Sequence, residues 1–372
     1  MNEEKIHVYD ATLREGAQKT GITFSVEDKL RILDRLINDL HIPMIEVGWP
    51  GSNPKDISLF KRIKNLDTNS SRIYAFSSTR RKNISVEQDQ NLQALLATGT
   101  PRVTIFGKSW DLHVEEALET TLEENLSMIE DTIMYLTKNG MEVVYDAEHF
   151  FDGFKHNQTY ALETITSAYN AGASWIVLCD TNGGILPHEL REIFQAVKDH
   201  LGDIPLGIHA HNDSGVANAL ALEALQQGAR MIQGTMNGFG ERCGNTDLTT
   251  ILPILKEKMG IDCISPEDLK NLTEVSHYVY TEANLQINPD QPFVGTNAFS
   301  HKGGVHSSAI KKDRRTYEHI KPTVVGNSRD IKVSELAGRS AILHMAKKFD
   351  IPLNRDNPKV SAILEVIKEK EN

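Results

Sequence analysis

The sequence predicts an α/β fold: a closed (β/α)8 TIM barrel followed by a small, mainly helical C-terminal subdomain. Short apolar runs rich in β-branched residues alternate eight times with longer segments of helical period. This alternation fills residues 1–260, close to the roughly 250 residues of a typical single barrel, and it stops after Gly260. The alternative is a doubly wound open sheet. Its Gly-rich phosphate turn would follow the first strand, where residues 9–16 instead read YDATLREG.

The eight expected strands are short, and several of them end in polar residues. In chain order they cover residues 6–11, 44–49, 72–77, 102–107, 142–147, 175–180, 206–211 and 231–236. In a closed parallel barrel the carboxyl ends of the strands meet at one rim, where barrel enzymes place their active sites. Many ionisable groups at one rim are costly without a bound ion, a ligand or internal pairing. We therefore expect the functional site there.

The helices between the strands carry recognisable end signals. They are expected at residues 25–40, 122–138, 159–171, 187–200 and 215–227. Ser25 followed by Asp28 resembles a capping box with the shorter acid. Gly140, Gly172 and Gly228 lie where helix C-caps belong. These signals separate each helix from the strand that follows it.

A second, smaller unit is expected after the barrel. We divide the chain into residues 1–260, the catalytic barrel, and residues 261–372, a linker and helical subdomain that contributes to the active site. Residues 266–284 are expected as one helix, with Ser265 as its N-cap and Pro266 at its first position. Two further helices are expected, at residues 334–349 and 358–370.

The composition is that of an ordinary globular protein, with 40% apolar and 24% charged residues. No run is apolar and long enough to span a membrane, and the first residues lack the apolar core of a signal peptide, so a cytoplasmic location is expected. The net charge of −11 disfavours nucleic acid as a partner but leaves room for an anionic substrate. Three cysteines without CxxC spacing suggest neither a disulfide framework nor a thiolate zinc site.

A pair of histidines ends the seventh expected strand. His209 and His211 project to the same side, because side chains alternate along a strand. Barrel closure places the eighth strand between the seventh and the first, so Asp10 can converge with them, and Asn245 could add an amide oxygen. One carboxylate and two imidazoles suit a divalent cation such as Mn, Zn, Mg or Co. The alternative is a set of structural polar residues that satisfy one another.

Further candidates lie beside this site. Arg14 could bind a substrate carboxylate through two parallel hydrogen bonds or stabilise an enolate, or else pair with Glu15 or Glu46. Glu46, at the end of the second strand, is a candidate for substrate binding. Thr181 could donate to a substrate carboxylate, or else act as a helix N-cap. Glu148 is a candidate acid or base, or else a support for its neighbour or the metal.

The second unit offers a histidine and a tyrosine. His306 follows two glycines closely, which allows close approach to a ligand, and Tyr317 comes eleven residues later. Delivered over the barrel mouth, this pair could serve proton transfer; the alternative is two surface loop residues. The basic run at residues 311–315 could meet the phosphates of a bulky cosubstrate, although a solvated charge run is the commoner explanation.

Three motifs together resemble those of the metal-dependent acyl-CoA Claisen condensation enzymes, the isopropylmalate, homocitrate and citramalate synthases. The motifs are residues 10–18 (DATLREGAQ), 209–213 (HAHND) and 240–245 (GERCGN). Further stretches resemble the citramalate synthase branch: residues 48–56 (GWPGSNPKD), 106–113 (FGKSWDLH), 145–153 (YDAEHFFDG) and 179–184 (CDTNGG). The resemblance runs from about residue 6 to about residue 345. Hydroxymethylglutaryl-CoA lyases share the barrel.

The resemblance implies an acyltransferase that condenses acetyl-CoA with pyruvate to citramalate and free CoA, feeding isoleucine biosynthesis through 2-oxobutanoate. Matched by position, the metal site is Asp10, His209, His211 and Asn245. Arg14 and Thr181 match residues that bind the oxo acid. His306 and Tyr317 match a catalytic pair delivered over the barrel, often from the partner subunit of a homodimer. His306, assisted by Tyr317 or Glu148, is the implied base that takes a proton from the acetyl group.

The sequence departs from the family pattern at a few points. Glu15 stands where many relatives have Asp, and Ala17 where many have Glu. The allosteric synthases carry a further C-terminal regulatory domain of roughly one hundred residues or more. Here the sequence stops at Asn372, so we expect either a truncated chain or a form without feedback control.

Three alternatives to this assignment stay open. The nearest is an isopropylmalate or homocitrate synthase, because one methylene in a small pocket is worth only ~1 to 3 kcal/mol. The second is a lyase or aldolase on the same barrel, which would need a reactive cysteine on a separate Gly-rich loop, unlike Cys243. The third is a catalytically impaired core that only binds ligands.

Overall fold

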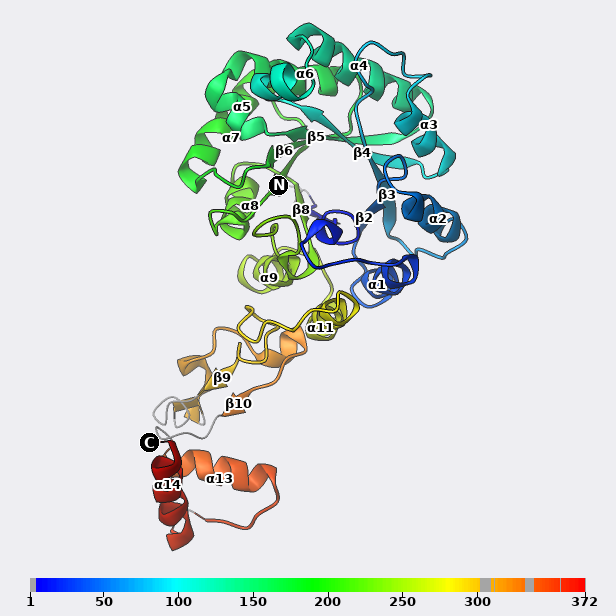
Figure 1. The fold of residues 1–372 in the computed structure, drawn as a ribbon. Coiled ribbons are helices and arrows are strands. Elements are labelled where there is room, and N and C mark those ends of the chain that lie inside the picture. The colour runs from blue at the N-terminus through cyan, green and yellow to red at the C-terminus, as the bar shows by residue number, and fades with distance from the viewer. Residues whose placement is uncertain (1–4, 302–308, 311, 332–337, 355, 372) are drawn as a thin grey trace.

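Eight parallel strands close into a barrel in the computed structural model, which describes residues 5–301, 309–310, 312–331, 338–354 and 356–371 (Figure 1). The strands are β1 (His7–Asp10), β2 (Met44–Gly48), β3 (Arg72–Ser78), β4 (Arg102–Lys108), β5 (Glu142–Glu148), β6 (Trp175–Asp180), β7 (Leu206–Ala210) and β8 (Met231–Gly234). Their spatial order follows the chain, and β8 returns to pair with β1, His7 opposite Met231. The predicted barrel and its eight strands are confirmed.

The barrel has two apolar layers, because strand side chains alternate between the lumen and the surrounding helices. The lumen is filled by Tyr9, Met44, Tyr74, Val144, Val177, Cys179 and Met231, with Ala11 at the edge of this cluster. The larger cluster packs the outer face of the sheet against the helices. The filled lumen is a packed core, so a ligand of the barrel is expected at the carboxyl ends of the strands.

Helices follow the strands and cover the outside of the barrel (Figure 1). They are α1 (Val26–Asn38), α2 (Pro54–Ile63), α3 (Gln90–Ala97), α4 (Leu122–Lys138), α5 (Phe150–His156), α6 (Gln158–Asn170), α7 (Pro187–Leu201), α8 (Ala217–Gln226) and α9 (Leu248–Pro253). The capping box predicted at the start of α1 is present: Ser25 accepts from the backbone of Asp28, whose side chain accepts from the backbone of Ser25. Of these helices, α2, α3, α5 and α9 are additions to the expected set.

The helix expected over residues 266–284 is divided in two, α10 (Pro266–Leu269) and α11 (Leu272–Glu282). The break falls where Gly326 packs on the carbonyl of Lys270, and where Asn271 donates through its side chain to the carbonyl of Asp39. In one continuous helix the carbonyl of Lys270 would accept a hydrogen bond from within the helix, and the Asn271 side chain would not be directed at Asp39. The packing of α11 on α1 therefore corrects the single-helix expectation.

The remaining chain forms a separate extension, shown in yellow to red in Figure 1, which leads away from the barrel. It contains a short parallel pair, β9 (Ser300–His301) with β10 (Asp330–Ile331), and the helices α13 (Arg339–Lys348) and α14 (Pro358–Glu371). The helices expected at residues 334–349 and 358–370 agree with α13 and α14, except that residues 332–337 lie outside the described part. The domain boundary at residue 260 stays a prediction. Among the described residues, no helix has the length and apolar character needed to cross a membrane.

Candidate active site

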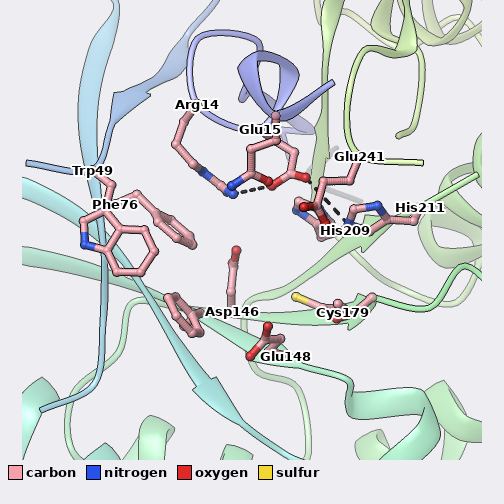
Figure 2. Close-up of a pocket in the computed structure, with 13 residues that line it drawn as sticks. Arg14, Glu15, Trp49, Phe76, Asp146, Glu148, Cys179, His209, His211 and Glu241 are labelled. Atoms are coloured by element: carbon pink, nitrogen blue, oxygen red, sulfur yellow. Dashed lines mark hydrogen bonds and ion pairs between the residues drawn. The ribbon is translucent and has the colours of Figure 1, made fainter. Parts of the chain in front are cut away.

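A cavity of about 190 Å³ opens at the carboxyl ends of the barrel strands. It is lined by Arg14, Glu15, Gln18, Trp49, Phe76, Phe106, Asp146, Glu148, Cys179, Thr181, His209, His211 and Glu241. Figure 2 shows Trp49 and Phe76 on one side, His209 and His211 on the other, and Asp146 between them. The cavity therefore has a polar side and an aromatic side.

Three residues on the polar side can ligate a cation. Glu15, in the turn after β1, and His209 and His211, at the end of β7, each offer one ligand atom, and these atoms lie within 4.8 Å of one another. All three side chains are buried. The two imidazole centroids are 5.3 Å apart, as expected for alternate residues of one strand.

Gln233 on β8 fixes the orientation of the His209 ring. Its Nε2 donates to Oδ1 of Asp146 at 2.9 Å, and its Oε1 lies 2.7 Å from Nδ1 of His209. Because an amide oxygen only accepts hydrogen bonds, Nδ1 carries the proton and Nε2 keeps its lone pair. Metal-binding histidines usually donate their other ring N–H to such a partner. Nε2 of His209 is thus prepared to ligate.

The charge states also suit a divalent cation. Burial and the neighbouring His209 lower the pKa of His211 to about 3, so its imidazole is neutral at neutral pH. Burial works to raise the pKa of Glu15, but Arg14 and the two histidines outweigh it, and the pKa lies below its ordinary value. A neutral imidazole and an ionised carboxylate are the forms that bind metals.

Two buried atoms near this group have no hydrogen-bond partner among the described residues, Nδ1 of His211 and Oδ1 of Asn245. The amide nitrogen of Asn245 lies 3.0 Å from Nε2 of His209, so a half-turn of the amide presents Oδ1 at that place. Buried polar groups without partners are rare and point to a missing water or ion. The donor set and these atoms fit a cation held by Glu15, His209 and His211, with Asn245 beside it.

Asp10, the expected carboxylate ligand, is not a member of this group of three, and its role as a ligand stays a prediction. It is fully buried, and its two oxygens accept from Thr12, from the backbone N–H at 2.9 Å and from the hydroxyl at 2.8 Å. Asp10 thereby closes the turn that follows β1. Glu15, five residues further along, offers a carboxylate oxygen close to both histidines.

Arg14 combines the two roles that the sequence left open. Its Nε donates to Oε1 of Glu46 at 2.6 Å, it pairs with Glu15, and its Cζ lies 3.6 Å from the ring centroid of Phe76. Burial opposes its charge, but Glu46 and Glu15 outweigh burial and raise its pKa. The guanidinium is therefore fixed and charged at the cavity wall. Glu46 is fully buried, where it accepts from Arg14 and from Tyr9 and so supports Arg14; its expected contact with substrate stays a prediction.

Thr181 and Glu148 both line the cavity. The hydroxyl oxygen of Thr181 accepts from the backbone N–H of His149 at 2.8 Å, so its own proton is available to a ligand. His149 itself adopts a left-handed conformation, φ 57°. Glu148 forms an ion pair with Lys108 at the end of the neighbouring strand.

The aromatic side consists of Trp49, Phe76 and Phe106. The Trp49 ring meets both phenylalanines edge-on at 5.5 Å between centroids, and the two phenylalanine rings stack at 5.3 Å. These contacts are at favoured aromatic distances and form a rigid apolar wall.

The expected residues of the second unit are not brought to this cavity by the described structure. His306 lies outside the described residues. Tyr317 is 44% exposed in the extension and is not among the residues that line the cavity. Their catalytic role stays a prediction.

The sequence analysis missed several residues of the site. Gln233, the aromatic wall and Glu15 as a candidate ligand were not predicted to act there. Strand alternation does give a signal for Asp146, which also lines the cavity: it lies two residues before Glu148 and so on the same side of β5. The aromatic wall had no such signal, because its members come from three different strands or the turns after them.

Two family models match the chain. The HMGL-like model covers residues 5–279, and the homocitrate synthase post-HMGL domain-like model covers residues 293–372. Together they extend over the barrel and the extension.

Similar proteins include two curated (R)-citramalate synthases. The one from Aquifex aeolicus is 50% identical over 368 residues, covering 99% of this chain and 70% of the relative. The one from Synechocystis sp. is 52% identical over 371 residues, covering 98% and 68%. A homocitrate synthase from Sulfolobus acidocaldarius is 32% identical, covering 99% and 76%. Among solved structures, an HMG-CoA lyase from Bacillus subtilis superposes with a TM-score of 0.65 at 18% identity, covering 76% of this chain and 95% of that one, which supports the fold alone.

Proposed function

The chain belongs to the HMGL-like family, and from this premise we propose that it condenses acetyl-CoA with pyruvate to give citramalate and CoA. The observation that carries the proposal is the identity of about half of all residues to (R)-citramalate synthases over nearly the whole chain. Homocitrate synthases are distinctly less similar, at 32%. The enzyme is an acyltransferase.

The polar side of the cavity is suited to an oxo acid. His209 and His211 would hold a divalent cation, with Glu15 or the predicted Asp10 as the carboxylate ligand and Asn245 as a further ligand. When bound, such a cation polarises the keto group and offsets the charge on its oxygen. Arg14 is fixed by Glu15 and Glu46, so its remaining N–H groups can bind the oxo acid without reorganisation. The free proton of Thr181 suits the substrate carboxylate.

The reaction needs a base that removes a proton from the methyl group of acetyl-CoA. Glu148 lines the cavity and is paired with Lys108, so among the described residues it is our candidate to hold that proton or to assist. His306 and Tyr317 are the further candidates, delivered by the second unit of the same chain or of a partner in a homodimer. The new carbon–carbon bond joins the methyl carbon of the acetyl group to the keto carbon of the oxo acid. Water then hydrolyses the thioester to release CoA.

The aromatic side limits the size of the oxo acid. The cavity of about 190 Å³ is closed opposite the histidines by the rings of Trp49, Phe76 and Phe106. Because these rings pack against one another, a larger substrate cannot displace one of them without disturbing the others. A methyl group, as in pyruvate, requires no displacement of these rings. Each additional methylene must displace them, at ~1 to 3 kcal/mol. This favours pyruvate over the larger acids of isopropylmalate and homocitrate synthases.

A CoA-release assay tests the proposal. The purified chain is supplied with Mn²⁺ or Mg²⁺, acetyl-CoA and either pyruvate, 2-oxoisovalerate or 2-oxoglutarate, and free thiol is measured. We expect the highest kcat/KM with pyruvate. A preference for either larger acid would overturn the substrate assignment, and cleavage of a hydroxymethylglutaryl thioester without acetyl-CoA would favour a lyase.

A further inference from the structure

A buried ion pair lies outside the cavity, between the helices α1 and α2. Nζ of Lys29 is 2.6 Å from Oδ1 of Asp56, and the side chains are only 8% and 6% exposed. Neither residue lines the cavity. Desolvation of two charges costs about as much as their attraction returns, so a buried pair is weak evidence for a stabilising role.

Both members of the pair bind the backbone at the end of β2. Lys29 Nζ donates to the carbonyl of Val47 at 3.2 Å, and Oδ2 of Asp56 accepts from the N–H of Trp49 at 2.9 Å. Between these two contacts lies Gly48, where a Cβ would approach Cγ of Asp56 to 2.5 Å. The two side chains thus bind the backbone of Val47 and Trp49, on either side of Gly48. Because Gly48 has no side chain, it leaves room for the carboxylate of Asp56.

The segment of residues 47–49 is irregular. The register of β2 with β3 shifts between Glu46 and Gly48, so Val47 has no partner residue on β3. A bulge of this kind re-aims the side chains that follow it. The ion pair supplies polar partners to this bulge.

Residues on both sides of the bulge belong to the site. Glu46, before it, accepts from Arg14, and Trp49, after it, forms the aromatic wall. We propose that Lys29 and Asp56 are positioning residues, which fix Trp49 against Phe76 and Phe106 and thereby set the size limit for the oxo acid. The identity of that acid rests on the proposed function; the placement of Trp49 does not.

The test removes both charges together, in the variant Lys29→Met/Asp56→Asn, so that no unpaired charge stays buried. Kinetics are measured with pyruvate and 2-oxobutanoate. We expect KM for pyruvate to rise ~10-fold with a smaller change in kcat, and kcat/KM for 2-oxobutanoate relative to pyruvate to rise ~5-fold, the order expected for a change in pocket size. In a Trp110→Phe/Trp175→Phe background, where Trp49 is the single tryptophan, acrylamide should quench the fluorescence more strongly once the pair is removed.

Two further variants test the same contacts of Lys29 and Asp56 with the end of β2. Gly48→Ala keeps both charges but pushes the Asp56 carboxylate away, and should shift the substrate ratio and the quenching in the same direction. Lys29→Arg keeps the charge and should leave both the substrate ratio and the quenching unchanged. If the double variant does not fold, these two variants decide the proposal.

The matched control is Arg80→Met. Arg80 is equally buried and pairs with Glu124 and Asp131, both at 2.7 Å, but it contacts neither β2 nor the cavity wall. It should lower the melting temperature without changing the substrate ratio. The proposal is overturned if the folded double variant, or Gly48→Ala, leaves both the ratio and the quenching at the control value. If the parent chain releases CoA from acetyl-CoA with none of the oxo acids, the proposed function fails, while the quenching still decides the positioning role.

Discussion

Replacement of Glu15 by Gln should weaken metal binding strongly. Oε1 of Glu15 lies 3.8 Å from Nε2 of His211, so an ion shared by the two side chains lies within about 4 Å of the carboxylate. At that distance, with an effective dielectric constant near 20, the lost charge is worth about 4 kcal/mol per unit of cation charge, or about a thousandfold in Kd. Because the Gln oxygen can still ligate, we expect the Kd for Mn²⁺ to rise about 100-fold or more, with a parallel loss of turnover.

The comparison with Asp10→Asn makes this prediction decisive. Both variants replace one carboxylate of the same motif by its amide, but both oxygens of Asp10 already accept hydrogen bonds from Thr12. Titration of the metal-free chains with Mn²⁺, followed by paramagnetic resonance or calorimetry, should give Asp10→Asn a nearly unchanged Kd. Loss of the metal from Asp10→Asn and its retention by Glu15→Gln would refute the assignment of Glu15.

Three further predictions concern pH, substrate size and substrate binding. The pKa of Asp10 is raised from 3.8 to about 7, mainly by burial, so the fold loses stability as the pH rises through this window, and Asp10→Asn should gain in Tm relative to the parent chain over the same window. A constant difference in scanning calorimetry would contradict this. Phe106→Ala should raise kcat/KM for 2-oxobutanoate relative to pyruvate ~10-fold, and an unchanged ratio would remove the aromatic wall from substrate contact. Thr181→Val should raise KM for pyruvate ~10-fold with less effect on kcat, and Thr181→Ser should restore it; equal KM values in the Val variant and the parent would exclude the hydroxyl as a donor.

Much of the fold could be predicted because its signals are local. The apolar strand runs and the capping box at Ser25 depend on the nearest residues alone, and both are present in the structure. The helix expected at residues 266–284 failed for the opposite reason: its break at Asn271 depends on packing against Asp39 and Gly326, far away in the chain.

Much of the site was predicted by the same local rule. Alternation placed His209 and His211 on one side of β7, and the strand-end positions of Arg14, Glu148 and Thr181 put them at the rim, where all five line one cavity. Strand periodicity gives no information once the strand has ended. It therefore did not place Glu15 beside the histidines, because that placement depends on the path of the turn after β1.

The sequence by itself determined the barrel, the rim as the place of the site and the two histidines, because periodicity and strand ends are properties of neighbouring residues. Only the tertiary structure decided which carboxylate faces those histidines, that Glu46 supports Arg14, and that Gln233 orients His209. The contacts of Lys29 and Asp56 with the end of β2 were likewise decided by the tertiary structure. Most of these contacts join residues from different strand–helix units, such as Glu15 with His211 and Gln233 with His209, and the packing of those units in the barrel brings such residues close together.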